Sequence, residues 1–592
     1  MCGIAGYYGK NICEDILLNF LSKLEYRGYD SSGIAIKKNN KINIIKNSIK
    51  VNELKQQVHT KTKDAIGIAH TRWATHGNVT KENAHPVSSE NGVWHLVHNG
   101  IIENYLELKQ ELSLSNVTFK GETDSEVVAQ LLEYENVNNI NDFIATISKL
   151  KGSFAICAFN NFDNTLYLAK NKSPLYIATK NSDYYIASDP VCFAEITNEY
   201  YSLNDNEYCI VFDNNLCFYN NKCNIISKKL NYLNFKYTKT SKENYSTFME
   251  KEINEIPKVL KNIINEYGKY NYFKPLNNVF KDVKNITIIG CGTAYHSGLI
   301  GATYLQNTLN VNAYSTIASE FICSNPIVDK NNVYIFVSQS GETADTLNAL
   351  NMVKHKCKTT IAITNVTYST LAKSCDIVLP VFAGPEIAVA STKAYNAQLF
   401  IFYLLSIYLK RNNLPKSLFK KLLKDFECLN INELYYFKNL ESLIANCDNL
   451  FLLGKHDDYF TAMEASLKIR EITYTNCASL PSGELKHGTL ALVSKDTLCF
   501  VISTNNNLHS KNTSSINEIK SRGGKVVLVT NNVKAFNDSK CIDYIIELPN
   551  IDSQLVSIVS VIPFQLIALQ YSLFKGINPD QPRNLAKSVT VE

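Results

Sequence analysis

The second half of the chain repeats one strand–glycine–helix pattern, and this repeat constrains the fold more than any other feature. One copy has a buried-strand run that ends at Gly290, and the other has a run that ends at Gly454, 164 residues later. The later strands keep nearly the same offset, up to 167 residues between Asp376 and Asp543. Short apolar runs that alternate with helical patterns are typical of βαβ units around a buried parallel sheet. The repeat therefore predicts two related, doubly wound α/β subdomains.

The first part of the chain has a different pattern. Short alternating or apolar runs, for example 65–70, 94–99 and 154–159, are separated by Gly, Asn and Asp turns, and helical patterns interrupt them at 15–26 and 125–133. We expect an α+β sheet sandwich here, so that the whole chain is an α/β multidomain protein. The expected divisions are a first domain at 2–235, a linker at 236–244, α/β subdomains at 245–425 and 426–575, and a C-terminal tail at 576–592.

Composition excludes several classes of protein. A chain of 592 residues with 45% hydrophobic and 19% charged residues is neither wholly disordered nor fibrous. Its net charge of +5 is small for this length, so we expect no nucleic-acid or membrane partner. The 16 cysteines form no CxxC pair, which favours a reducing, cytoplasmic location.

One uncharged stretch, 553–574, is long enough to cross a membrane. Gln554, Gln565, Gln570 and Pro563 interrupt it, so we favour a buried core helix over a membrane helix. The N-terminal segment MCGIAGYYGK shows no secretory signal.

Cys2 is a candidate nucleophile. If Met1 is removed, Cys2 carries a thiol and a free α-amine, which titrates near neutral pH and can act as general base for its own side chain. Taken alone, an ordinary second-position cysteine is the simpler interpretation.

Three polar groups further along the chain suit an amino-acid substrate. Arg72 offers a planar fork for a carboxylate, and Asp124 offers a charge for an α-amino group. Asn99 and the backbone N–H of Gly100 are suited to an oxyanion hole. Each has an alternative: Arg72 as a surface pairing residue, Asn99-Gly100 as a hairpin turn, and Asp124 as a helix N-cap.

Five segments, MCGIAGY, EYRGYDS, HTRWATHG, HNGIIEN and GETDSE, closely resemble the class II (N-terminal nucleophile) glutamine amidotransferases. The resemblance implies that Cys2 attacks the glutamine side-chain amide, forming a thioester and releasing ammonia. By residue, it implies an oxyanion hole at Asn99 and Gly100, glutamine binding by Arg72, Thr75, His76 and Asp124, support of the nucleophile by Arg27 and Gly28, and an ammonia gate at Trp73.

A hydroxyl-rich loop follows a buried strand in the first repeat. Ser338, Gln339, Ser340 and Thr343 lie there, just before a helical pattern that starts at Ala344. Free N–H groups at a helix N-terminus and several hydroxyls favour a phosphate group, although helix capping alone is the alternative. GxxxxGK[ST] is absent, so no nucleotide or Mg²⁺ is implied.

Three groups near the end of the chain suit sugar chemistry. Lys587 is able to form a Schiff base with a ketose, His487 to move protons during ring opening, and Glu471 to transfer a proton between carbons. The alternatives are a solvated tail charge, a structural histidine, and a simple Lys468–Glu471 helix pair.

The segments CGTAYHSG, SQSGETADT, EIAVASTKAY, LKIREITY, GELKHG and QPRNLAKSVTVE resemble the sugar isomerase (SIS) half of the glucosamine-6-phosphate synthase family. The resemblance implies Lys587 as the imine-forming lysine, His487 in ring opening, Glu471 in proton transfer between C1 and C2, and sugar-phosphate contacts at Thr293, Ser338, Gln339, Ser340, Thr343, Val389, Lys468 and Ala586. Ala294 departs from the serine that this family often has, which puts one sugar hydroxyl contact in doubt.

Both resemblances together imply a synthase that uses glutamine and fructose 6-phosphate, passes ammonia through a channel, and makes glutamate and glucosamine 6-phosphate for UDP-N-acetylglucosamine. We expect a homodimer, no cofactor and no metal. Another class II amidotransferase, or a non-catalytic SIS sugar-phosphate sensor, are the alternatives.

Overall fold

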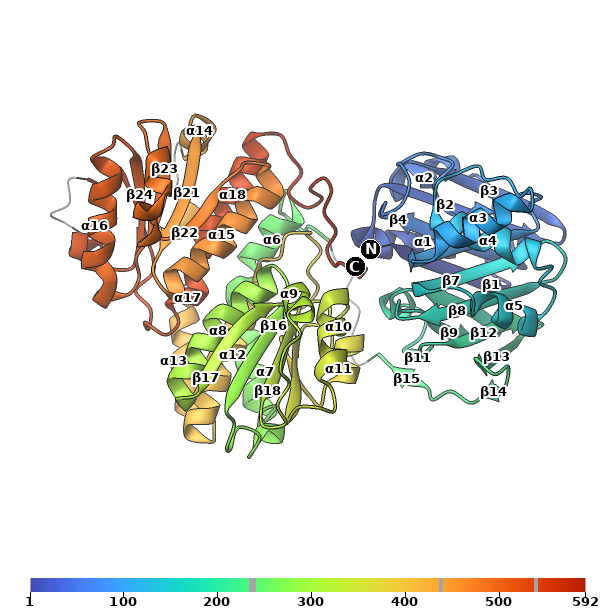
Figure 1. The fold of residues 1–592 in the computed structure, drawn as a ribbon, viewed down its shortest axis with the longest axis horizontal. Coiled ribbons are helices and arrows are strands. Elements are labelled where there is room, and N and C mark those ends of the chain that lie inside the picture. Colours follow the sequence, from blue (N-terminus) through green and yellow to red (C-terminus); the bar gives the residue numbers. More distant parts are fainter. Residues whose placement is uncertain (1, 234–240, 428, 436–439, 537–540, 591–592) are drawn as a thin grey trace. The chain divides into compact units, whose positions relative to one another are not determined.

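The computed structural model describes residues 2–233, 241–427, 429–435, 440–536 and 541–590 (Figure 1). The chain divides into two compact units, residues 1–239 with 588–592, and residues 240–587. Of the expected linker 236–244, residues 236–240 lie outside the described residues, as do the last two residues of the expected tail 576–592.

Two antiparallel sheets form the first unit. One has the strand order β15-β11-β9-β10-β1-β4-β2-β3, and the other has the order β14-β13-β12-β8-β7-β6-β5. The strands are β1 Gly3–Gly9, β2 Ser31–Lys38, β3 Lys41–Asn47, β4 Ala65–Arg72, β5 Val87–Ser88, β6 Trp94–Ile102, β7 Gly152–Asn160, β8 Thr165–Asn171, β9 Tyr176–Lys180, β10 Asp183–Ala187, β11 Glu199–Ser202, β12 Glu207–Phe212, β13 Asn215–Asn220, β14 Ile225–Ile226 and β15 Asn231–Tyr232.

Helices cover the outer faces of these sheets. The helices are α1 Cys13–Leu24, α2 Val51–Gln57, α3 Tyr105–Leu114, α4 Asp124–Tyr134 and α5 Ile140–Ile147. One apolar cluster joins the inner faces of the two sheets, a second joins α1 and α2 to the first sheet, and a third joins α3, α4 and α5 to the other. The expected α+β sandwich is confirmed. Its last three strands, β13 to β15, lie in an Asn- and Lys-rich stretch that shows little strand pattern.

The second unit holds two five-stranded parallel sheets with the same topology. Their orders are β17-β16-β18-β19-β20 and β22-β21-β23-β24-β25. The strands are β16 Asn285–Gly290, β17 Asn312–Ile317, β18 Val333–Ser338, β19 Thr359–Thr364, β20 Ile377–Pro380, β21 Asn449–Gly454, β22 Ala478–Pro481, β23 Thr497–Ile502, β24 Lys525–Thr530 and β25 Tyr544–Glu547. Corresponding strands confirm the two related α/β subdomains that the repeat predicts.

The helices of the second unit lie on both faces of these sheets, as a doubly wound fold requires. They are α6 Phe248–Asn254, α7 Ile256–Lys269, α8 Thr293–Leu309, α9 Ala318–Cys323, α10 Ala344–Val353, α11 Thr370–Ser374, α12 Lys393–Arg411, α13 Lys416–Glu427, α14 Leu440–Ala445, α15 Asp457–Thr473, α16 His509–Lys520, α17 Val556–Val559 and α18 Ile562–Phe574. One continuous apolar cluster includes residues from both sheets, from α12 and from α18.

The uncharged stretch forms α17 and α18. Among the described residues, Val556–Phe574 is the one helical run long and apolar enough to cross a membrane, and 89% of it is buried inside the protein. Helix α18 packs against α15. This burial is what a core helix shows.

A glycine ends the first strand of each repeat because the next helix begins against it. A Cβ on Gly290 would lie 3.0 Å from the carbonyl carbon of Ala294, and one on Gly454 would lie 2.3 Å from that of Asp458. The contact at Gly454 is too close for any side chain, and the one at Gly290 would force the start of α8 to shift. The strand–glycine–helix pattern thus marks a tight turn at the carboxyl edge of the sheet.

The residue before each of these helices adopts the same unusual backbone conformation. Gly292 precedes α8 with φ 52° and ψ −124°, and His456 precedes α15 with φ 58° and ψ −123°. Only glycine adopts this region without strain, so the second repeat stores strain that the first does not.

His456→Gly should raise the free energy of unfolding of the second unit by about 1 kcal/mol, because relief of strain exceeds the added flexibility of the unfolded chain. Gly292→Ala, the matched change in the first repeat, should lower it. The measurement is the urea midpoint by circular dichroism, since both tryptophans, Trp73 and Trp94, lie in the first unit. A lower midpoint for His456→Gly would contradict the strain argument.

Candidate functional site

Cys2 immediately precedes β1 and lies against the end of β4. Its Sγ accepts a hydrogen bond from the Trp73 backbone N–H at 3.3 Å and lies 3.4 Å from the Trp73 carbonyl oxygen. Burial raises the pKa of the Cys2 thiol above its ordinary value. A nearby base is therefore needed to make this sulfur nucleophilic. Met1, whose removal we expect, lies outside the described residues.

Asn99 and Gly100 lie within strand β6, paired with β7, so the alternative of a hairpin turn is wrong. The Asn99 Nδ2 donates a hydrogen bond to the Cys2 carbonyl oxygen at 2.9 Å, which places this amide beside the thiol-bearing residue. Gly100 has φ 125°, and a Cβ there would lie 1.8 Å from the Ser153 carbonyl oxygen. Only glycine fits at this position, from which we expect a backbone N–H of the oxyanion hole.

Arg72 is 4% exposed, so the alternative of a surface pairing residue is wrong. Its guanidinium donates to the carbonyl oxygens of Asn78 and Gly77, each at 3.2 Å, and to that of His76. Arg72 thereby shapes the loop that carries Thr75, which is exposed, and the half-buried His76.

Asp124 is the first residue of α4, whereas Thr123 caps that helix, so the N-cap alternative is wrong. Its carboxylate is 4% exposed and accepts a hydrogen bond from the Ile102 backbone N–H at 2.9 Å. Capping therefore does not explain this buried carboxylate, which lies beside the end of β6. A buried negative charge is suited to binding a positively charged group of a ligand.

Arg27 forms a buried ion pair that the sequence did not reveal. Its Nη2 lies 2.7 Å from Asp189 Oδ2, and Tyr26 donates to the same carboxylate oxygen at 2.6 Å. Asp189 comes from a distant loop, and only the Asp-Pro turn signal marks it in the sequence. Gly28 donates its N–H to the Glu25 carbonyl oxygen at 3.2 Å, and the Trp73 ring meets Tyr29 edge to face at 6.0 Å.

In the second unit, the hydroxyl-rich loop connects β18 to α10. Ser338 Oγ lies 3.0 Å from Thr343 Oγ1 and accepts the Gly341 N–H at 3.0 Å, while the Glu342 N–H bonds to Ser340 Oγ at 3.2 Å. Gly341 has φ 67°, and a Cβ there would lie 2.0 Å from Ser369 Oγ. Gln339 holds this loop to β19 through its carbonyl oxygen, 3.2 Å from the Asn365 N–H. The loop is a tight turn with its hydroxyls at a helix N-terminus.

A buried charge network joins the two repeats. Lys468 on α15 has a side chain with 0% exposure, and its Nζ lies 2.9 Å from Glu471 Oε2 and 3.3 Å from Glu464 Oε1. It also donates to Thr293 Oγ1 at 3.1 Å, on α8 of the other repeat. Burial lowers the pKa of Lys468, but the two carboxylates outweigh it and raise that pKa above its ordinary value.

Glu464, which the sequence did not single out, completes this network. It accepts hydrogen bonds from Thr293 Oγ1 at 3.0 Å and from His296 Nδ1 at 2.7 Å. Burial raises the pKa of Glu471 above its ordinary value. The Lys468–Glu471 pair is thus more than a surface helix pair.

Lys587 is buried against a glutamate rather than solvated, so the alternative of a tail charge is wrong. Its Nζ lies 2.5 Å from Glu386 Oε2 and donates to the Ala388 carbonyl oxygen at 2.8 Å. Glu386 also accepts the backbone N–H groups of Thr392 and Ala394, each at 3.0 Å. The one sequence signal for Glu386 is a charge within an otherwise apolar segment, EIAVA.

A second buried carboxyl lies beside this pair. Glu252 on α6 accepts the N–H groups of Ile387 and Ala388, and its Oε2 has no hydrogen-bond partner among the described residues. Burial and the charge of Glu386 raise the pKa of Glu252 from its ordinary value of 4.5 to about 8. Burial also raises that of Glu386, but the Lys587 ammonium and the backbone donors hold it below its ordinary value.

The tail that carries Lys587 is fixed at several points. Asp580 accepts the N–H groups of Phe248 and Met249 at 2.9 and 2.8 Å, and its carbonyl oxygen accepts the Val389 N–H at 3.1 Å. The Arg583 guanidinium lies 4.3 Å from the centre of the Tyr474 ring. Ala586, next to Lys587, is half-buried. These contacts hold Val389 against the tail, while Lys587 bonds to the neighbouring residue Ala388.

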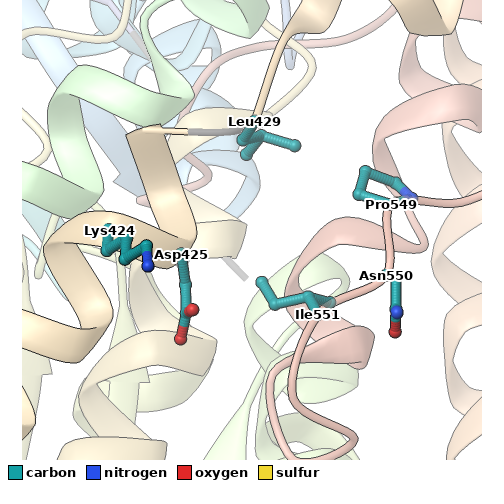
Figure 2. Close-up of a pocket in the computed structure, with 6 residues that line it drawn as sticks. All are labelled: Lys424, Asp425, Leu429, Pro549, Asn550 and Ile551. Carbon is teal, nitrogen blue, oxygen red and sulfur yellow. The ribbon is translucent and has the colours of Figure 1, made fainter.

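His487 is not brought to this group. It lies in a short 3₁₀ segment, Glu484–His487, is exposed, and its side chain makes no hydrogen bond to another described residue. Among the described residues there is no group of three or more metal-ligating side chains. A surface pocket between α13 and the loop after β25 is lined by Lys424, Asp425, Leu429, Pro549, Asn550 and Ile551 (Figure 2). It contains none of the candidate residues.

Comparison with known proteins gives two family matches and full-length relatives. The SIS domain family matches residues 279–408 and 443–574, and the glutamine amidotransferase domain family matches residues 70–195. The glutamine–fructose-6-phosphate aminotransferases (isomerizing) of Bacillus subtilis and Bacillus licheniformis are 39% and 38% identical, over 100% of both chains. The C-terminal domain of the glucosamine-fructose-6-phosphate aminotransferase of Francisella tularensis has a TM-score of 0.53 and 30% identity, covering 58% of this chain and all of that one.

The raised pKa of Glu252 predicts a pH dependence of stability. A carboxyl with a raised pKa stabilises the fold while it is protonated, below its ordinary value of 4.5, and this contribution is lost as pH rises toward about 8. Wild-type protein should therefore lose stability relative to Glu252→Gln between pH 5.5 and 8.5, measured as urea midpoints. Glu255→Gln, which removes the partner of Lys393 in the same region, should show a constant difference from wild type. Parallel curves for wild type and Glu252→Gln would contradict the assignment.

Proposed function

The chain belongs to the glutamine–fructose-6-phosphate aminotransferase (isomerizing) family, and we propose that the Cys2 and Lys587 sites divide the reaction of that family between them. The enzyme transfers the amide nitrogen of glutamine to fructose 6-phosphate and isomerises the sugar, giving glutamate and glucosamine 6-phosphate. This product begins hexosamine biosynthesis. The full-length relatives are all named as this aminotransferase, so they disfavour the alternatives of another amidotransferase or a sugar-phosphate sensor.

The proposed glutaminase half begins at Cys2. The α-amine of residue 2 takes the thiol proton, the sulfur attacks the glutamine amide carbon, and the C–N bond breaks as ammonia leaves. The observation that supports this most directly is the Asn99 amide beside Cys2, next to a Gly100 position that only glycine can occupy. These donors would stabilise the tetrahedral oxyanion. Water then hydrolyses the thioester to glutamate.

Glutamine would be held by both of its charged ends. Arg72 is the proposed carboxylate partner and Asp124 the proposed α-amino partner, and both are buried, which strengthens their interaction with a charged ligand. Thr75 and His76 lie on the loop that Arg72 holds, so they would close over the substrate. Arg27 and Gly28 support the segment beneath the nucleophile, and Trp73 is the proposed gate for ammonia.

The proposed synthase half lies at the carboxyl edge of the first parallel sheet. Ser338, Gln339, Ser340 and Thr343 would hold the phosphate at the N-terminus of α10, where backbone N–H groups favour an anion. Thr293, Val389, Lys468 and Ala586 would contact the sugar. This edge, at the point where the strand order reverses, is where doubly wound sheets bind ligands.

In the chemical step, the Lys587 amine would attack the ketone carbon of open-chain fructose 6-phosphate, and loss of water leaves an imine. The Lys587 ammonium must first lose a proton to solvent, and Glu386 is the carboxylate that holds this side chain in place. Ammonia from the first site would add to this imine carbon and expel the Lys587 amine, which leaves the imine of ammonia at C2. Glu471 would then move a proton from C1 to C2, which gives the amino sugar.

We also propose a homodimer and a cytoplasmic location. His487 is exposed and is not among the residues that bond to Lys587, which supports a role in ring opening at the site of a partner subunit. The 15 described cysteines are all free thiols, which suits a reducing compartment.

Cys2→Ala should abolish glutamine-dependent synthesis, by at least about 10³-fold, because no other group can form the thioester. The assay follows glutamate and glucosamine 6-phosphate together by mass spectrometry, with and without fructose 6-phosphate. Wild type should release both products in equal amounts. Cys13→Ala, a buried cysteine of α1, is the matched control and should keep the activity. Glutamine-dependent product from Cys2→Ala would remove Cys2 as the nucleophile.

Borohydride reduction in the presence of fructose 6-phosphate should attach the sugar phosphate to the peptide that contains Lys587. Lys587→Arg keeps the charge opposite Glu386 but cannot form an imine, so trapping should disappear. Lys393→Arg, a second buried lysine paired with a glutamate, is the control and should still be trapped. A sugar adduct on any other lysine of wild type would overturn the assignment of Lys587.

A further inference from the structure

A buried histidine lies behind the Asn99 amide. His70, on β4, is 0% exposed, and its Nε2 lies 2.9 Å from the His98 carbonyl oxygen and 3.0 Å from Asn99 Oδ1. A carbonyl oxygen only accepts hydrogen bonds, so the His98 contact requires that Nε2 carries the proton. His70 is therefore the Nε2–H tautomer, and it donates to both oxygens.

This donor fixes which way the Asn99 carboxamide points. With Oδ1 toward His70, the Nδ2 group faces the Cys2 carbonyl oxygen at 2.9 Å. Rotating the amide by half a turn would place two donors against each other at His70 and two acceptors against each other at Cys2. The amide NH₂ has two hydrogens, and the bond to the Cys2 carbonyl uses one. The other remains for the oxyanion that forms beside Cys2.

A second histidine holds the His70 ring in place. His85 Nδ1 lies 3.0 Å from His70 Nδ1 and 3.3 Å from His70 Nε2, and the ring planes are 82° apart. A group nearly equidistant from both ring nitrogens lies over the face of the ring, not in its plane, so His85 contacts the His70 face edge-on. His85 is itself 4% exposed.

Burial keeps this pair uncharged. It lowers the pKa of His70 to about 3 and that of His85 well below its ordinary value. A neutral His70 keeps one fixed N–H donor through the whole range of pH in which an enzyme works. Because His70 does not take up a proton in this range, it cannot act as a general base for Cys2.

We propose that His70 is a positioning residue of the glutaminase reaction: it locks the Asn99 carboxamide with its NH₂ toward Cys2, and His85 clamps the His70 ring. The inference rests on the proposed role of Cys2 and Asn99. His70 touches neither the thiol nor the substrate, so it acts only through Asn99. Without it, the amide can rotate and present an oxygen to the developing negative charge. Since one oxyanion-hole donor is worth about 10²–10³ in kcat, partial loss of its orientation should cost about 10–10².

The first test compares two substitutions of His70 in the full chain. His70→Leu removes the donor and should lower the glutaminase kcat about 10–10²-fold, with the KM for glutamine changed less than about threefold. His70→Gln carries an amide N–H at nearly the position of Nε2 and should restore most of that loss. If leucine prevents folding, His70→Asn, which is too short to reach Asn99, takes its place with the same expected loss. Alkylation of Cys2 by iodoacetamide should stay near the wild-type rate, because the nucleophile itself is unchanged.

His95 provides a matched control on the strand that carries Asn99. It is 4% exposed and bonds to Ser88 Oγ at 2.8 Å and to the Gly92 carbonyl oxygen at 3.1 Å, away from His70. His95→Leu should leave the glutaminase kcat near the wild-type value. Equal losses in His95→Leu and His70→Leu, with no rescue by His70→Gln, would mean a general cost of losing a buried histidine and would overturn the proposal.

A double-mutant cycle separates positioning from any independent role. In the Asn99→Ala background, His70→Leu should cost no more than about twofold, because the group on which it acts is gone. Additive losses would overturn the proposal. Retained glutaminase activity in Cys2→Ala would instead mean that the proposed function itself fails, so the two failures are distinguishable.

Discussion

The ammonium of Lys468 is the interaction on which the second unit depends. A lysine with no exposure to solvent is stable only when carboxylates compensate its charge, and here Glu464 and Glu471 do so. Glu464 in turn binds Thr293 and His296, which belong to the other repeat. The buried Lys468 charge would be destabilising without partners, but with them it links α15 of one repeat to α8 of the other. It fixes Glu471 opposite the loop at the start of α8, which is where the proposed sugar chemistry needs a carboxyl group.

In the first unit, the pairing of strands rather than buried charges positions the residues of the proposed site. Cys2 precedes β1, and β1 pairs with β4 in a register that places Gly3 opposite Thr71. Arg72 therefore comes next to the nucleophile by backbone geometry alone. Because a shift of one residue would turn every side chain of a strand to the other face, the register of β1 on β4 is as much a part of the site as its side chains are. Gly100, which tolerates no Cβ, shows how closely β6 and β7 meet there.

The sequence predicted what depends on local pattern. The strand–glycine–helix repeat predicted two sheets with one topology, and the motifs led to Cys2, Asn99, Glu471 and Lys587. Glu386 pairs with a lysine 201 residues away, Glu464 with a histidine 168 residues away and Asp189 with an arginine 162 residues away, so nothing local in the sequence identifies these partners. His70 lies only 29 residues before Asn99, but its orienting contact joins strands of two different sheets. Strands β13 to β15 were missed because their many Asn and Lys residues obscure the alternation of apolar and polar side chains that is typical of a strand. The turn proposed at Asn99-Gly100 was wrong because a strand pairing outweighs a dipeptide preference.

The apolar cluster that runs through both repeats of the second unit has a mechanical consequence. Since residues of both sheets, of α12 and of α18 share one core, each repeat would expose one face of its sheet to water if the other repeat were lost, although each keeps an apolar cluster of its own. The duplicated halves are therefore not separate domains in the thermodynamic sense. They should melt in one cooperative transition, and a ligand bound at the proposed sugar-phosphate site would stabilise the helices of both.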